Sequence, residues 1–148
     1  MLVYKRKAHY HEVDKMGVVH HSNYVKWMEE ARIEAVAEFG ISFKEAEENG
    51  ILSPIVNISV DYKRPVAFGD EVEIRVTILK YNGAVMELGY EFYNLTAGCL
   101  CTVATSRNCF VVGGRVTSLK KAAPEADAKL RAIYEAQQTQ AASERGGD

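Results

Sequence analysis

Residues 10–24 hold the side chains of this chain that are best suited to chemistry. Asp14 lies in a turn-like stretch and precedes Gly17, where a glycine lets backbone approach a ligand closely. His20 and His21 follow, directly before residues with a helical pattern. A helix start exposes unpaired N–H groups and partial positive charge, so it can polarise a carbonyl oxygen. A carboxylate facing such donors is the minimal apparatus for acyl transfer to water.

A long helix is expected directly after the histidines, over residues 22–39. Apolar residues recur there at spacings of three and four, which gives the helix one apolar face. Ser22 or Asn23 suits its N-terminal cap. A shorter helix is predicted over residues 42–49, with Ser42 as its cap. The apolar face of the long helix consists of Tyr24, Trp27, Met28, Ala31, Ala35 and Phe39.

From residue 51 onward the pattern alternates, which predicts strands up to about residue 112, in addition to a first strand over residues 2–10. Asn82-Gly83 is a strong hairpin signal. Short connections make neighbouring strands antiparallel, and the long helix can bury its apolar face only against their sheet. The predicted fold is α+β, an antiparallel sheet wrapped around a long central helix. The strand faces expected to be apolar are Val56, Ile58, Val60 and Tyr62, then Val72, Ile74, Val76 and Ile78, then Met86, Leu88, Tyr90 and Phe92.

One domain is expected over residues 1–121, followed by a helix-prone tail over residues 122–148. Leu130, Ile133 and Tyr134 give this tail a narrow apolar stripe, which suffices for weak docking. Residues 141–148 are predicted to be disordered.

The composition is that of an ordinary soluble globular protein, with 47% apolar and 26% charged residues. A formal net charge of -2 argues against a general nucleic-acid or membrane-surface binder. No apolar run approaches the roughly 18 residues of a membrane span, and no secretory signal is recognised. Cys99, Cys101 and Cys109 are expected to be buried free thiols in a reducing compartment. A cytoplasmic location is predicted, without a nucleic-acid partner or membrane insertion.

Metal and nucleotide chemistry find no support in the sequence. His9 and His11 are expected on one face of a strand, and His20 and His21 are adjacent, so the four do not complete a tetrahedral set. The chain has no Gly-x-Ser-x-Gly elbow, no phosphate loop and no Gly-x-Gly-x-x-Gly fingerprint. We therefore predict neither a metal nor another cofactor.

Residues 10–32 closely resemble the signature of the hotdog-fold acyl-CoA thioesterases, in the branch of the 4-hydroxybenzoyl-CoA and Tol–Pal-associated thioesterases. That signature reads approximately as an aromatic residue, then Asp-x-x-Gly-Val-Val-x-His-x-x-Tyr, then Glu-x-Ala-Arg. Residues 62–65 and Gly69-Asp70 are similar to the same branch. The resemblance extends over about residues 2–120 and implies the fold expected above. The matching residues are Tyr10, Asp14, Gly17, Val18, Val19, His21, Tyr24, Glu29 or Glu30, Ala31 and Arg32.

The resemblance implies hydrolysis of an acyl thioester to the free acid and CoA. Asp14 would act as nucleophile or as general base, and the sequence leaves both roles open. The backbone N–H at His21 would polarise the thioester oxygen. The family site lies at a dimer interface, and dimers often pair, so a homodimer or homotetramer is expected. The catalytic candidates are Asp14 and His21, and the substrate-binding candidates are Gly17, Val19, His20, Tyr24, Lys63 and Arg64.

The substrate is only partly defined by these residues. Lys63-Arg64 lies at a strand end, where two cations can rim a pocket and bind substrate phosphates. The carrier can be CoA or acyl carrier protein, since both present the same thioester. His20 stands where an aromatic residue is common, and Lys15-Met16 replace small residues, so the acyl group stays open as well.

Two alternative functions share the expected fold. One is a hotdog enoyl-CoA hydratase or dehydratase, in which His21 would work with Glu29 or Glu30 of the central helix. The other is a non-catalytic dimer that binds acyl thioesters.

Overall fold

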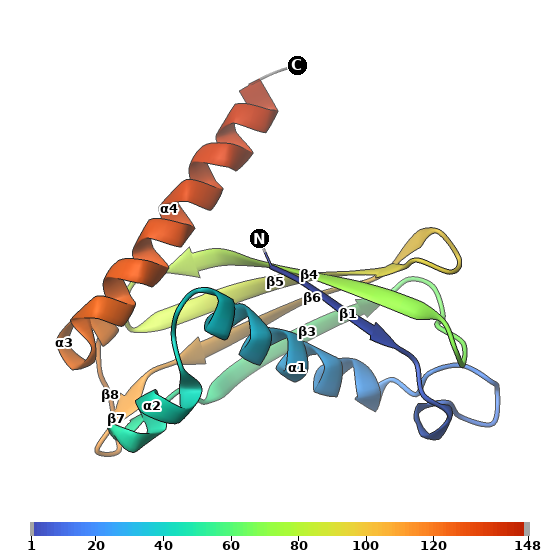
Figure 1. Ribbon diagram of the computed structural model, residues 1–148, viewed down its shortest axis with the longest axis horizontal. Helices are drawn as coiled ribbons and strands as arrows, with labels where there is room; N and C mark the ends of the chain where they lie inside the picture. Colours follow the sequence, from blue (N-terminus) through green and yellow to red (C-terminus); the bar gives the residue numbers. More distant parts are fainter. Residues whose placement is uncertain (1, 147–148) are drawn as a thin grey trace.

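The computed structural model describes residues 2–146 and contains a five-stranded antiparallel sheet that wraps around one long helix, α1 (Ser22–Glu38) (Figure 1). The predicted α+β architecture is confirmed. The strand order is β1-β4-β5-β6-β3, so the first strand pairs with the fourth. The bounds are β1 (Leu2–Lys7), β3 (Ile55–Tyr62), β4 (Glu71–Tyr81), β5 (Val85–Asn94) and β6 (Cys99–Cys109).

The core lies between α1 and the inner face of the sheet. Trp27, Ala31 and Ala35 of α1 are fully buried, and the two alanines let the helix backbone lie close to the strands. The alternating faces predicted for β4 and β5 are confirmed, because every one of their eight residues is buried. Arg32 is buried as well, which the apolar pattern did not predict. Its guanidinium pairs with Glu29 at 2.8 Å.

Short elements close the end of the molecule where α1 stops. Helix α2 (Phe43–Glu48) begins as predicted, since the Ser42 side chain accepts the Glu45 N–H. A small three-stranded sheet follows the order β2-β7-β8, and α3 precedes the C-terminal helix. The bounds are β2 (Ile51–Leu52), β7 (Val111–Val112), β8 (Arg115–Val116) and α3 (Leu119–Ala122).

Strand β3 forms one edge of the large sheet, and its expected apolar face is only partly covered. Val60 packs against the core, but Val56, Ile58 and Tyr62 are 54%, 38% and 49% exposed. Since β3 pairs only with β6 in the part of the chain that the structure describes, its other edge presents unpaired backbone groups there. A long edge strand with exposed apolar side chains is typical of a surface that another chain covers.

The first strand is shorter than predicted, and the expectation for His9 and His11 is wrong. β1 ends at Lys7, and residues Tyr10–Glu12 form a 3-10 turn, η1. The Glu12 carboxylate accepts the His9 N–H at 2.8 Å, which closes this turn. The two imidazoles therefore do not share a strand face, and their ring centroids lie 5.6 Å apart.

The C-terminal segment forms helix α4 (Pro124–Gly146), which docks at its start and rises from the sheet toward its end (Figure 1). Docking through Leu130 is confirmed, because this side chain is buried. The disorder predicted from residue 141 is wrong up to residue 146, since strong helix formers continue the helix there. The rest of that prediction falls on residues 147–148, outside the described chain. Within residues 2–146, no helix has both the length and the apolar composition to cross a bilayer.

Candidate active site

Asp14 lies in a tight loop between η1 and α1. Its backbone N–H donates to Val18 O at 2.9 Å, and the Gly17 N–H donates to Asp14 O at 3.0 Å. Gly17 has a φ of +80°, which only glycine adopts without strain. Asp14 Oδ1 accepts the Met16 N–H at 2.8 Å, whereas Oδ2 has no hydrogen-bond partner within residues 2–146. The loop thus fixes the carboxylate by one oxygen and leaves the other free.

The loop is fastened to the body on both sides of Asp14. After Asp14 in the chain, the N–H of Val19 donates to Val66 O at 2.7 Å, and the Val19 side chain is buried. Before Asp14 in the chain, the carbonyl of Glu12 accepts the His20 N–H and the side-chain amide N–H of Asn23, both at 2.9 Å. Predicted substrate residue Val19 therefore contributes to the core, while Gly17 lies exposed at the loop tip.

The start of α1 leaves one backbone donor open. The Ser22 N–H donates to Nδ1 of His20, and the Asn23 and Tyr24 N–H groups donate to the carbonyls of His20 and His21. In the described chain, the His21 N–H has no such partner. The N-cap residue is His21, which makes no side-chain cap bond, so the prediction of Ser22 or Asn23 as cap is wrong, and the neighbouring His20 imidazole accepts the Ser22 N–H instead.

The aromatic residues beside the helix start form a layered wall. Tyr62 at the end of β3 donates its hydroxyl to His21 O at 3.1 Å, and its ring meets Tyr24 edge-on at 5.0 Å. Tyr24 lies beneath, almost fully buried, and burial raises its pKa to about 12. Of the two, it is Tyr62 that faces solvent, although only Tyr24 had been predicted to bind substrate.

The two histidines are exposed and adjacent. Their ring centroids lie 4.1 Å apart, and Nδ1 of His20 is 2.8 Å from the Ser22 hydroxyl. The glutamates of α1 bind elsewhere: Glu29 pairs with Arg32 at 2.8 Å, and Glu30 pairs with Arg6 at 2.7 Å. Within residues 2–146 neither carboxylate hydrogen-bonds His21, so the pair required for the dehydratase alternative is not formed.

Lys63 and Arg64 directly follow Tyr62. Their backbone N–H groups both donate to Cys101 O at 2.9 Å, which fastens this corner to β6. Both side chains are exposed, and neither forms a salt bridge in the described part of the chain. The two cations are therefore available to an anionic ligand near the helix start.

An open hollow lies over the Asp14 loop. Its exposed aromatic walls are Tyr10 and Phe68, which are 77% and 59% exposed and meet edge-on at 5.7 Å. Sequence reasoning missed Phe68, whose only signal is a large apolar residue in the Ala67–Asp70 turn. The full lining is Tyr10, His11, Val13, Asp14, Lys15, Gly17 and Phe68.

A larger cavity, of about 780 Å³, lies at the opposite end of α1, between α2 and α4. Its lining is mostly apolar and contains none of the candidate site residues. The free carboxylate oxygen and the open amide both lie at the Asp14 end, which makes that end the candidate active site. Among residues 2–146, no three His, Cys, Asp or Glu side chains gather as a metal site would require.

Comparison with known proteins finds relatives whose names describe the hydrolysis of CoA thioesters. A putative acyl-CoA thioesterase of Bacillus subtilis, YneP, is 38% identical over 105 residues, which cover 71% of this chain and 75% of that protein. A 1,4-dihydroxy-2-naphthoyl-CoA hydrolase of Prochlorococcus marinus is 28% identical over 97 residues, covering 62% of this chain and 65% of that protein. The structure of a DHNA-CoA thioesterase from Staphylococcus aureus matches 99% of this chain and 95% of its own, with a TM-score of 0.84 and 26% identity.

The family profile extends over most of the chain and includes the Asp14 loop, α1 and every strand of the large sheet except β1. It matches residues 8–133, from just after β1 into α4. The chain therefore belongs to the thioesterase-like superfamily.

Proposed function

We propose that this protein hydrolyses acyl-CoA thioesters to the free acid and CoA, with Asp14 and the start of α1 as its active site. The observation that carries the proposal is the open His21 N–H at the end of the loop that presents the free Asp14 Oδ2. The family membership and the named thioester hydrolases among its relatives support the reaction type.

In this proposal the His21 N–H donates to the thioester oxygen as negative charge develops on it, aided by the dipole of α1. Asp14 either attacks the carbonyl carbon, forming an anhydride that water then hydrolyses, or takes a proton from the attacking water. In both cases the carbon–sulfur bond breaks and the CoA thiolate leaves. His21 contributes through its backbone, so its imidazole has no required role.

The substrate is proposed to carry a hydroxylated aromatic acyl group. The Prochlorococcus hydrolase and the Staphylococcus thioesterase are named for dihydroxynaphthoyl-type CoA esters. The exposed rings of Tyr10 and Phe68 beside Asp14 suit a flat acyl group, because aromatic rings pack edge-on or offset against each other. Lys63 and Arg64 would bind the phosphates of CoA. Membership of the 4-hydroxybenzoyl-CoA and Tol–Pal branch stays a prediction.

The active unit is proposed to be at least a dimer that joins through the free edge of β3. The supporting observation is the exposed apolar row on this edge strand, which ends at Tyr62 beside His21. A second copy paired along β3 would bring its own residues to the site. Light scattering should give at least twice the 16.5 kDa of the chain. A monomer with full activity at nanomolar concentration would contradict this arrangement.

A panel of aliphatic and aromatic acyl-CoA esters tests the reaction. We expect release of free thiol, fastest with hydroxylated aromatic acyl groups. Hydration of an enoyl-CoA without thiol release would favour the hydratase alternative. Tight binding of the panel without any turnover would favour the non-catalytic dimer.

A further inference from the structure

Glu12 is a buried carboxylate that the proposed mechanism does not use. Only 5% of the residue is exposed. Its Oε2 accepts the Trp27 indole N–H at 2.7 Å, and its Oε1 accepts the His9 N–H at 2.8 Å. Arg6 reaches both oxygens with one nitrogen, at 2.8 and 2.9 Å. Burial alone would raise the pKa of Glu12, but these hydrogen bonds and the Arg6 charge lower it below its ordinary value.

The backbone of Glu12 is held just as firmly as its side chain. Its carbonyl accepts the His20 N–H and the Asn23 side-chain amide, both at 2.9 Å. One residue thus joins β1, through Arg6, to the first turns of α1, through Asn23 and Trp27. Asp14 lies two residues further along the chain.

Asp14 itself has no comparable hold on the helix. Among residues 2–146, its carboxylate bonds only to amides of its own loop, at Met16 and weakly at Val18. The position of the carboxylate relative to the His21 amide therefore depends on where the loop is anchored. Misplacement of a reacting group by about 1 Å can lower a rate by about 100-fold.

We propose that Glu12 is a positioning residue, which sets the distance between the Asp14 carboxylate and the amide at the start of α1. This inference rests on the proposed function, since it assigns Glu12 an effect through Asp14. Glu12 is not among the residues that line the hollow over Asp14, and its carboxylate is bound by Arg6, His9 and Trp27. Its substitution should therefore lower kcat and leave KM nearly unchanged.

Glu30 offers a matched control. It also pairs with Arg6, at 2.7 Å, and accepts the Tyr4 hydroxyl at 2.8 Å, but within residues 2–146 it hydrogen-bonds no residue of the Asp14 loop. Loss of either carboxylate disturbs the same guanidinium. Only loss of the Glu12 carboxylate removes the bonds that tie the segment before Asp14 to Trp27 and Arg6. The comparison of Glu12→Gln with Glu30→Gln thus separates positioning from general stability.

The test is a kinetic cycle on the full chain, with thiol release from the best panel ester. Glu12→Gln should lower kcat by about 10- to 100-fold with KM within about twofold, whereas Glu30→Gln should keep both within about twofold. In the Asp14→Asn background, Glu12→Gln should have less than about a twofold further effect, because residues that act through one group are not additive.

Three results would overturn the inference: a folded Glu12→Gln variant with normal kcat, an equal loss in Glu30→Gln, or full additivity with Asp14→Asn. Should Glu12→Gln fail to fold, the charge-balanced Arg6→Gln/Glu12→Gln variant takes its place, with the same expected loss of kcat. If Asp14→Asn itself keeps wild-type activity, the proposed function fails. If Asp14→Asn is inactive while Glu12→Gln is normal, only the positioning role fails.

Discussion

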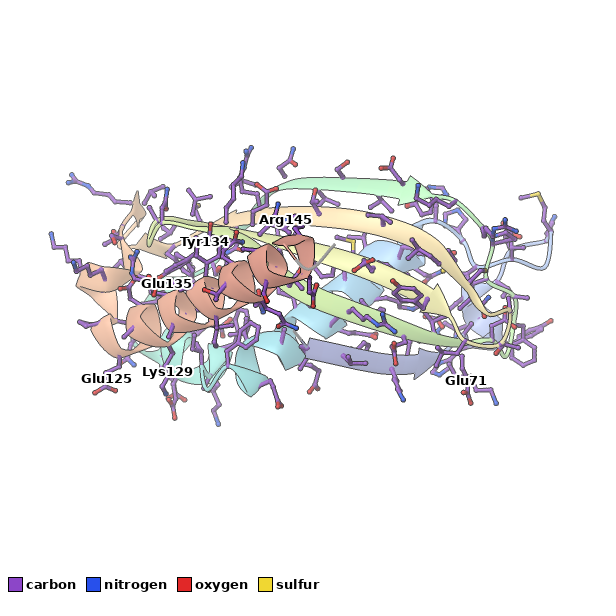
Figure 2. The ribbon with its side chains drawn as sticks, turned by 90° about the horizontal axis from the view of Figure 1, so that it is seen from above. Glu71, Glu125, Lys129, Tyr134, Glu135 and Arg145 are labelled. Atoms are coloured by element: carbon purple, nitrogen blue, oxygen red, sulfur yellow. The ribbon has the colours of Figure 1, made fainter. Side chains whose placement is uncertain are left out.

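Asp14 and Asp127 lie at opposite ends of the molecule, and their surroundings are opposite in kind. Figure 2 shows Glu71, at the start of β4, and Glu125, in the first turn of α4, at opposite ends of the molecule. The Asp14 loop belongs to the first of these ends, because its Val18 bridges Ala67 just before β4, whereas Asp127 shares the first turn of α4 with Glu125. Helix α1, with 17 residues or about 25 Å, lies between these ends. Asp14 keeps one carboxylate oxygen free. Asp127 is buried, and its Oδ1 accepts both the Tyr81 hydroxyl and the Arg131 guanidinium.

This contrast shows what makes an aspartate available for reaction. A buried acid that accepts from a buried hydroxyl contributes to stability, because removing it leaves that hydroxyl unsatisfied. An acid that is fastened by one oxygen in a partly exposed loop keeps its other oxygen for a substrate. Asp14→Asn should therefore lower activity and leave stability unchanged, whereas Asp127→Asn should lower stability and leave activity nearly unchanged.

The largest effect on stability is expected at the α4 end. Asp127→Asn should lower the free energy of unfolding by about 1–3 kcal/mol, since the buried Tyr81 hydroxyl loses a charged acceptor. Urea unfolding measures this, and kcat should stay within about twofold of wild type. Glu135→Gln, on the exposed side of α4, is the control and should change stability by less than about 0.5 kcal/mol. Equal losses in both variants would contradict the structural role of Asp127.

The same pair predicts how stability depends on pH. Burial alone would raise the pKa of Asp127, but the bonds from Tyr81 and Arg131 lower it overall, so its contribution is present above the unfolded pKa of about 3.9 and is lost as pH falls through the folded value. Burial and the Asp127 carboxylate raise the pKa of Tyr81, so the contribution of its hydroxyl is present below about pH 10 and is lost in stronger alkali. Unfolding free energies measured from pH 2 to 11 should show both losses of stability, an acid limb at low pH and an alkaline limb at high pH. Asp127→Asn should flatten the acid limb, and an unchanged acid limb would assign it to other carboxylates.

Much of the fold could be predicted from the sequence, because it depends on periodicity. The alternation of β4 and β5 and the apolar face of α1 follow directly from which residues must be buried. The first strand was predicted too long, because alternation does not reveal that Glu12 turns back to cap His9. The helical residues 141–146 were missed because a polar, alanine-rich segment has no apolar pattern to distinguish helix from disorder.

The candidate site was predictable only where a motif or a helix start marked it. Asp14, Gly17 and His21 follow from the loop and the resemblance; Gly17 bonds to Asp14 within the loop, His21 is the N-cap of the helix that follows it, and their roles stay predictions. Glu12 was not recognised, because its role depends on contacts with Arg6 and Trp27 that are distant in sequence. Phe68 was missed for the same reason.

A smaller effect is expected from the histidine at the helix start. His21→Ala should lower kcat by less than about tenfold, because the proposed donor is its backbone N–H and remains in place. His21→Pro, which removes that N–H, is the informative partner variant and should lose far more activity. If His21→Ala were as inactive as His21→Pro, the imidazole itself would have to take part, and the dehydratase-like alternative would gain support.

The smallest effect is expected at Arg64, on the rim of the proposed active site. Arg64→Glu should raise KM for acyl-CoA about three- to tenfold and leave kcat nearly unchanged, because an exposed cation contributes to binding and not to the reacting carbonyl. Lys120→Glu, on exposed α3 at the other end, should change neither constant. If Lys120→Glu raised KM and Arg64→Glu did not, the phosphates of CoA would be assigned to the Lys120-Lys121 cluster instead.

Single-turnover thiol release by Asp14→Asn, with enzyme in excess over the best panel ester, tests the central claim most directly. Under these conditions product release does not limit the rate, so the measurement reports the chemical step. We expect a rate at least about 100-fold below that of wild type, with an unchanged urea unfolding curve. A folded Asp14→Asn variant that retains more than about a third of the wild-type rate would remove Asp14 from the reaction.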